Sequence, residues 1–128
     1  MSYKIERLVD LPALLLSFGD DVSFLLSMGD ASEEFHKILE AAETPLYCIV
    51  DFRSVQMSFN DIMSGIQHGT KGSQNMKHPN NKQLIILSES KAIATVAKGL
   101  NTVTFGNINA IVLPNLEEAV AYIRANAA

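Results

Sequence analysis

Short, almost continuous apolar runs alternate with amphipathic stretches over much of this 128-residue chain. The clearest runs are residues 45–52, 83–87 and 109–113. Runs of this length that are rich in Ile and Val, each followed by a helical pattern, are typical of strands buried on both faces. The pattern therefore predicts an α/β fold with a mostly parallel sheet flanked by helices.

Four amphipathic helices are predicted from apolar residues spaced three and four positions apart. Each stretch opens with a side chain that can cap a helix N-terminus, and these residues are Asp30, Ser58, Ser90 and Asn115. The apolar faces are formed by Phe35, Ile38, Leu39 and Ala42; by Phe59, Ile62, Met63 and Ile66; by Ile93, Val96, Ala97 and Leu100; and by Leu116, Ala119, Val120 and Ile123.

The N-terminal part has a different pattern. Residues 3–9 alternate loosely, residues 13–18 are nearly all apolar, and residues 10–12 (Asp-Leu-Pro) favour a turn between them. We expect an antiparallel pair whose first strand lies at a sheet edge, with its charged side chains in water. Residues 22–29 fit a strand, a helix or a packed loop. The prediction for residues 1–128 is a single domain with a mixed, mostly parallel sheet of about five strands and about four helices.

Charge and composition exclude several classes of function. The net charge is −4 and the ten Lys and Arg residues are scattered, so no basic surface for nucleic acid is expected. The first ten residues lack the apolar core of a secretory signal, and no run reaches the roughly 18 apolar residues of a membrane span. The single cysteine, Cys48, lies in an apolar run, where a buried thiol is the favoured interpretation. We expect a soluble cytoplasmic protein.

This order of elements resembles the STAS domain family, and within it the SpoIIAA-like proteins. The resemblance is carried by two opening strands, a strand ending in Asp51, and a last strand leading into the Leu-Glu-Glu-Ala helix start at residues 116–119. In the family's anti-sigma antagonists, an Asp-Ser pair opens the helix after the strand that ends in Asp, and this Ser is phosphorylated. Residues 54–61 contain no Asp-Ser pair, and Ser58 is the nearest hydroxyl at the predicted helix start. A plain N-cap is the favoured interpretation of Ser58, and a regulatory phosphosite is the alternative.

A phosphoryl-accepting receiver domain is a rival α/β interpretation. Asp20 and Asp21 follow one strand, Asp51 ends another and Ser88 ends a third, as the acidic pair, acceptor and hydroxyl of a receiver would. However, only one helix is predicted between the acidic pair and the Asp51 strand, and the last strand offers no Lys before Pro114. The missing cation would leave a developing phosphoryl charge without its counter-charge, so Asp51 is interpreted as a strand-end residue that fixes the next loop.

The polar residues 68–82 form the most function-like stretch, with two His, three Lys and several amides. This stretch leads into the amino end of a strand, whereas ligands gather at the carboxyl ends in such sheets. The favoured interpretation is therefore a solvated helix end and loop, in which Pro79 halts the helix and Asn80 and Asn81 turn the chain. No Cys or carboxylate lies at ligand spacing from His68 or His78, so no metal site is expected, and His36 is interpreted as a surface residue.

No common catalytic motif is found, so neither an enzyme nor a cofactor is expected. The chain has more large apolar residues than the apolar faces of the predicted helices account for. This excess points to an interface formed by Phe24, Leu25, Met28, Val103 and Phe105. The predicted function is a regulatory or interaction module that works by docking a protein partner or by forming a homodimer. The alternative is a binder or carrier of a small apolar ligand such as a lipid.

Overall fold

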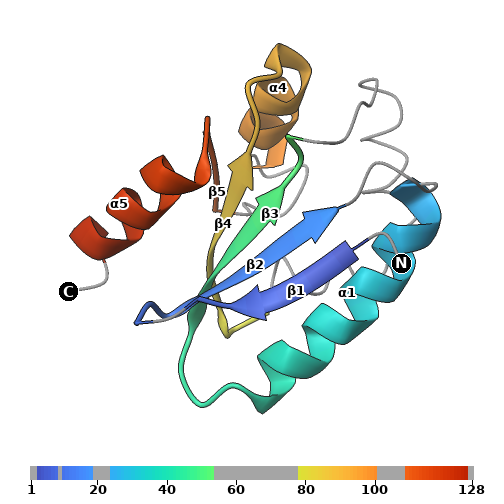
Figure 1. The fold of residues 1–128 in the computed structure, drawn as a ribbon, viewed down its shortest axis with the longest axis vertical. Coiled ribbons are helices and arrows are strands. Elements are labelled where there is room, and N and C mark those ends of the chain that lie inside the picture. The colour runs from blue at the N-terminus through green and yellow to red at the C-terminus, as the bar shows by residue number, and fades with distance from the viewer. Residues whose placement is uncertain (1–2, 9, 19–23, 54–77, 101–108, 127–128) are drawn as a thin grey trace.

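The computed structural model describes residues 3–8, 10–18, 24–53, 78–100 and 109–126 (Figure 1). The elements, in chain order, are β1 (Tyr3–Arg7), β2 (Ala13–Phe18), α1 (Phe24–Ala41), β3 (Leu46–Asp51), β4 (Asn81–Leu87), α4 (Lys91–Leu100), β5 (Ala110–Leu113) and α5 (Leu116–Asn126).

The five strands form one sheet in the order β1-β2-β3-β4-β5. β1 runs antiparallel to β2, and every other pair is parallel, with Cys48 aligned between Leu14 and Leu84. The predicted mixed, mostly parallel five-stranded sheet is therefore confirmed. It differs from the receiver alternative, whose doubly wound sheet has the order 2-1-3-4-5.

The turn between β1 and β2 is fixed by backbone hydrogen bonds. The N–H of Leu8 donates to the carbonyl of Ala13 at 3.0 Å, and the N–H of Ala13 donates to the carbonyl of Leu11 at 2.9 Å. Asp10 has a φ of 64°, in the left-handed region that Asp tolerates better than most residues. The predicted antiparallel pair and the edge position of β1 are both confirmed.

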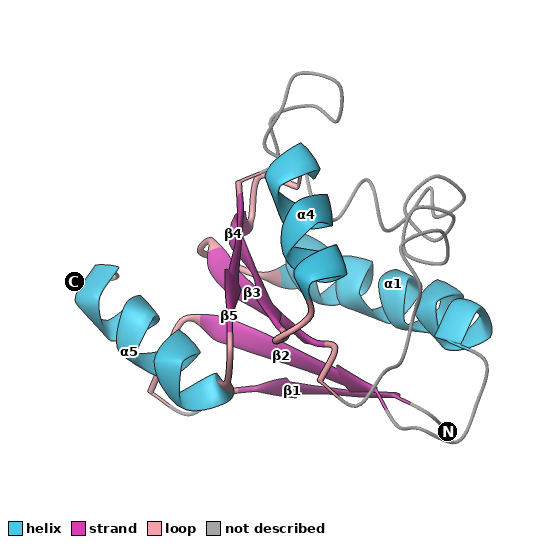
Figure 2. Cartoon of the chain, turned by 90° about the horizontal axis from the view of Figure 1, so that it is seen from above, coloured by secondary structure: helices cyan, strands magenta, loops and turns pink. Residues whose placement is uncertain are grey.

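Helices cover the two faces of the sheet unequally (Figure 2). α1 and α4 lie on one side of the sheet, and α5 lies on the other. Successive strand residues point to opposite faces, so the same strands contribute to two separate apolar cores. The core under α1 contains Leu14, Leu16, Ala31, Phe35, Leu39, Leu46 and Cys48, and the core under α5 contains Ala13, Leu15, Tyr47, Ile49, Ile85, Leu87, Ala119 and Ile123.

Two of the predicted helix starts are confirmed by their caps. The Ser90 hydroxyl accepts the N–H of Ile93 at 3.4 Å before α4, and the Asn115 side chain accepts the N–H of Glu118 at 2.9 Å before α5. The predicted start of the first helix at Asp30 is wrong, because α1 begins at Phe24. The helix predicted over residues 59–66 lies outside the described residues.

The buried strands match the prediction for β3 and β4 but not for β5. Residues Leu46 to Ile49 of β3 and Leu84 to Leu87 of β4 are buried. In β5 only Ala110 is buried, and its three other residues are partly exposed. β5 is the last strand of the sheet and pairs with β4 alone in the described part of the chain, which is why its apolar residues are incompletely covered.

None of the helices in the described ranges is both long and apolar enough to span a bilayer.

Candidate functional site

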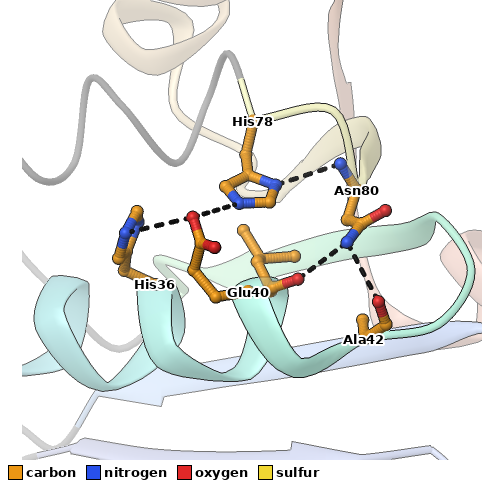
Figure 3. A network of polar contacts seen from close by, with 6 residues as sticks. His36, Glu40, Ala42, His78 and Asn80 are labelled. Carbon is orange, nitrogen blue, oxygen red and sulfur yellow. Dashed lines mark hydrogen bonds and ion pairs between the residues drawn. The ribbon is translucent and has the colours of Figure 1, made fainter.

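A cluster of two histidines and a glutamate lies where α1 approaches the start of β4 (Figure 3). His36 and Glu40 are one helical turn apart on α1, so their side chains share a face of the helix. His36 Nε2 lies 3.5 Å from Glu40 Oε1. The Glu40 side chain is 61% exposed and His36 is half-buried, so the cluster is open to solvent on the glutamate side.

His78 completes the cluster from a distant part of the sequence. Its Nε2 lies 3.0 Å from the same Glu40 oxygen, and its side chain is only 10% exposed. The His36 and His78 rings meet edge to face, with centroids 5.7 Å apart. The three possible ligand atoms, one from each residue, all lie within 4.8 Å of one another.

Asn80 fixes both the histidine and the helix end. Its backbone N–H donates to His78 Nδ1 at 3.0 Å, so Nδ1 presents a lone pair and Nε2 carries the proton donated to Glu40. Its side-chain amide donates to the carbonyls of Leu39 at 2.8 Å and Ala42 at 3.1 Å, two acceptors at the end of α1 (Figure 3). Asn80 therefore attaches the turn before β4 to the C-terminus of α1.

Two sequence-based interpretations fail at this cluster. His36 is not a simple surface residue, since it contacts both Glu40 and His78. His78 does have a close carboxylate, which comes from a residue 38 positions away. The spacing of His36 and Glu40 was the one available signal. The predicted turn is confirmed, because the N–H of Asn81 donates to the carbonyl of His78 at 2.9 Å.

Asp51 and Arg53 form a second polar site, at the carboxyl end of β3. One Asp51 oxygen accepts the Arg53 N–H at 2.9 Å and its Nε at 3.0 Å, and the other accepts Nη2 at 2.8 Å. Burial raises the pKa of the Asp51 carboxyl, but the hydrogen bonds and charge of Arg53 outweigh it, so the pKa lies below its ordinary value of 3.8. The interpretation of Asp51 as a strand-end residue that fixes the next loop is supported by these bonds.

We expect this pair to make stability depend on acid pH. A carboxyl whose pKa is depressed by folding stabilises the native state above its unfolded pKa, and this contribution disappears as the pH falls through the folded pKa. Because the Arg53 side chain is 42% exposed, Asp51→Asn should cost less than about 1 kcal/mol at pH 7. Urea unfolding at pH 7 and pH 3 should show the gap between wild type and variant closing at the lower pH. An equal gap at both pH values would contradict the role of this ion pair.

Cys48 is buried in β3, where its Sγ lies 3.7 Å from the carbonyl oxygen of Leu46. Burial raises the pKa of its thiol from 9.0 to about 12, which lowers the fraction of reactive thiolate about a thousandfold. We therefore expect the native protein to resist a thiol-specific reagent that labels Cys48 rapidly in urea. Rapid labelling of the native state would show that the core under α1 opens readily.

A polar group that the sequence did not indicate lies between β4 and α5. The Tyr122 hydroxyl donates to Gln83 Oε1 at 2.7 Å, and Gln83 Nε2 donates to Asn109 Oδ1 at 3.1 Å. The Tyr122 ring also packs edge to face on Tyr47, whose ring lies under the Lys82 ammonium at 5.2 Å from the centroid. These contacts satisfy a buried glutamine and join the two elements, a structural role.

The interface and phosphosite residues proposed from the sequence are placed only in part. Phe24, Leu25 and Met28 belong to the first turns of α1, which resolves the open assignment of this segment as a helix from Phe24 onward. Ser58, Val103 and Phe105 lie outside the described residues. Within the described ranges, β5 is one of the elements whose apolar residues are incompletely covered.

Comparison with known proteins places the chain by its fold. No protein-family model matches the sequence, and no curated protein matches it. Among solved structures it is similar to an uncharacterised protein of the DUF3478 family from Shewanella loihica, which is described as having a SpoIIAA-like fold. The two sequences are 15% identical, the match covers 95% of this chain and 92% of the other, and the TM-score is 0.56. The fold expected from the sequence is thus confirmed, and this chain has a SpoIIAA-like fold.

Proposed function

We propose that this protein is a non-catalytic regulatory module that works by docking, and that its β5 edge pairs with β5 of a second copy. The observation that carries the proposal is that Ile111, Val112 and Leu113 on the last strand of the sheet are all partly exposed, although Ile111 and Leu113 also pack against the core under α5. Apolar surface of this kind is stabilised when another protein surface covers it.

The two edges of the sheet differ in a way that supports this choice. β1 carries Lys4, Glu6 and Arg7, and charged side chains on an edge strand oppose pairing with another strand. β5 carries no charge along its length. An uncharged apolar edge is the kind of strand to which a second strand adds.

The backbone of β5 is also directed suitably. The carbonyls of Asn109 and Leu113 accept the N–H groups of Leu84 and Ser88, both at 3.0 Å. Peptide groups alternate in direction along a strand, so the N–H and C=O of Val112 point away from β4. They face the side from which a second copy would approach.

We propose a non-catalytic function because the potentially reactive side chains of the described residues are engaged in structural contacts. Cys48 is buried with a raised pKa, and Asp51 is held by Arg53. His78 is held between Asn80 and Glu40. Each of these potential nucleophiles or bases is engaged in a contact that stabilises the fold, which favours a structural role for it.

Light scattering over a range of protein concentrations tests self-association. Wild type should approach twice its chain mass of 14.0 kDa as the concentration rises. Val112→Lys, which places a charge on the edge, should remain monomeric. Ala121→Lys puts the same charge on an exposed position of α5 and should associate like wild type. A wild-type protein that stays monomeric at every concentration would contradict the proposal.

Native mass spectrometry of the purified protein distinguishes docking from the alternative of an apolar ligand. A dimer whose mass is that of two bare chains supports docking. A co-purifying lipid-sized molecule would support the carrier function instead.

A further inference from the structure

We propose that His36, Glu40 and His78 form a binding site for a divalent transition-metal ion, and that Zn²⁺ is the ion its donors fit best. This proposal is independent of docking at β5. It reverses the expectation from the sequence, which rested on the lack of a carboxylate near the histidines.

The donor set is the first support. Two imidazole nitrogens and one carboxylate oxygen form a ligand combination that zinc takes in proteins, whereas Mg²⁺ and Ca²⁺ prefer oxygen ligands alone. Zinc–ligand bonds of about 2.1 Å at tetrahedral angles place neighbouring ligand atoms about 3.4 Å apart. The distances from Glu40 Oε1 to the two histidine nitrogens are 3.5 Å and 3.0 Å. The three ligand atoms all lie within 4.8 Å of one another, so binding the ion requires side-chain movement mainly between the two histidines.

The supporting framework is the second argument. His36 and Glu40 are held one turn apart on α1, whose buried residues Phe35 and Leu39 anchor this part of the helix to the sheet. His78 lies in a turn that Asn80 ties to the end of the same helix. The three ligands thus come from elements that are already fixed relative to each other, so little conformational entropy is lost when an ion binds.

Because of the Asn80 N–H, we expect this site to bind zinc less tightly than a site in which the second ring nitrogen of each histidine donates to an acceptor. A metal ion on His78 Nε2 requires the lone pair of that nitrogen, so the ring proton moves through solvent from Nε2 to Nδ1 with no net proton change. Nδ1–H then faces the N–H of Asn80, instead of the acceptor that usually orients a metal-bound histidine. Lack of such an outer partner weakens metal binding by about 10- to 100-fold, so we expect a labile site whose occupancy follows the zinc supply.

Zinc titration of the full chain, followed by calorimetry, tests the site. Wild type should bind one Zn²⁺ per chain and unfold at a higher temperature in its presence, since an ion that binds only the native state stabilises it. Mg²⁺ should have no effect. Affinity should fall in acid solution, because both imidazoles must be neutral to act as ligands.

Matched variants separate the site from other zinc-binding groups. Glu40→Gln keeps the size of the side chain but should weaken zinc binding by more than about tenfold, since a direct ligand matters more than its outer partner. Glu34→Gln removes the same charge from an exposed position on α1 and should bind as wild type does. Val112→Lys should also bind zinc as wild type does. A failure of the docking proposal can therefore be distinguished from a failure of the zinc proposal.

An NMR measurement keeps the proposal testable if a variant folds poorly. In wild type, zinc should shift the Asn80 amide resonance and convert the His78 ring from the Nε2–H to the Nδ1–H form. The proposal is overturned if wild type shows no saturable binding at one ion per chain, or if Glu40→Gln binds zinc as tightly as wild type. It is also overturned if zinc leaves the Asn80 and His78 signals unchanged.

Discussion

Replacing Ile85 with alanine is expected to lower the free energy of unfolding by about 2 to 5 kcal/mol, because the change removes buried methyl groups and leaves a cavity. Ile85 is 0% exposed and lies in β4, in register with Ile49 on β3 and Ile111 on β5. Its side chain belongs to the core that α5 closes through Ala119 and Ile123.

Urea unfolding of Ile85→Ala beside Val112→Ala measures this effect. Val112 is on the edge strand and only partly buried, so its truncation should cost about 1 kcal/mol or less. Equal losses at the two positions would show that β4 is not at the centre of the core. Wild type and both variants are compared at concentrations low enough for the proteins to be monomeric, so that association does not contribute to the measured free energy of unfolding.

Replacing Asn80 with alanine should cost about 1 to 3 kcal/mol, the sum expected for two hydrogen bonds that contribute about 0.5 to 1.5 kcal/mol each. The lost donors leave the carbonyls of Leu39 and Ala42 without their side-chain partner at the end of α1. The backbone bond from residue 80 to His78 is retained, so the change tests the side chain alone.

Asn126→Ala is the matched control for Asn80. Its side-chain amide also donates to a helix carbonyl, that of Tyr122 at 2.8 Å, but the contact is exposed. We expect its removal to change stability by no more than about 0.5 kcal/mol. Equal effects of the two substitutions, measured by urea unfolding, would show that Asn80 does not join the turn to α1.

The strands and two of the four predicted helix starts could be predicted because their signals are local. The Ile- and Val-rich runs of β3 and β4 are buried as expected, and Ser90 and Asn115 cap the helices that follow β4 and β5. Local signals were misleading where tertiary packing outweighs them. Asp30 suggested a helix start, but α1 begins earlier and continues through Gly29 and Asp30, since a mid-helix glycine costs only about 1 kcal/mol.

The cluster at the end of α1 could not be predicted, because it depends on which distant residues the sheet brings together. His36 and Glu40 are one turn apart in sequence, but the approach of His78 follows from the β3–β4 register and the turn before β4. The partial exposure of β5 was missed for a similar reason. An apolar run does not reveal whether its strand lies inside the sheet or at its edge.

Amide hydrogen exchange at Val112 tests most directly whether β5 pairs with a second copy. The N–H of this residue points away from β4, so a strand that joins this edge would hydrogen-bond it. We predict that its exchange slows as the wild-type concentration rises, while the Leu84 amide, already bonded to Asn109 within one chain, exchanges at a constant rate. Exchange at Val112 that is independent of concentration would contradict docking through β5.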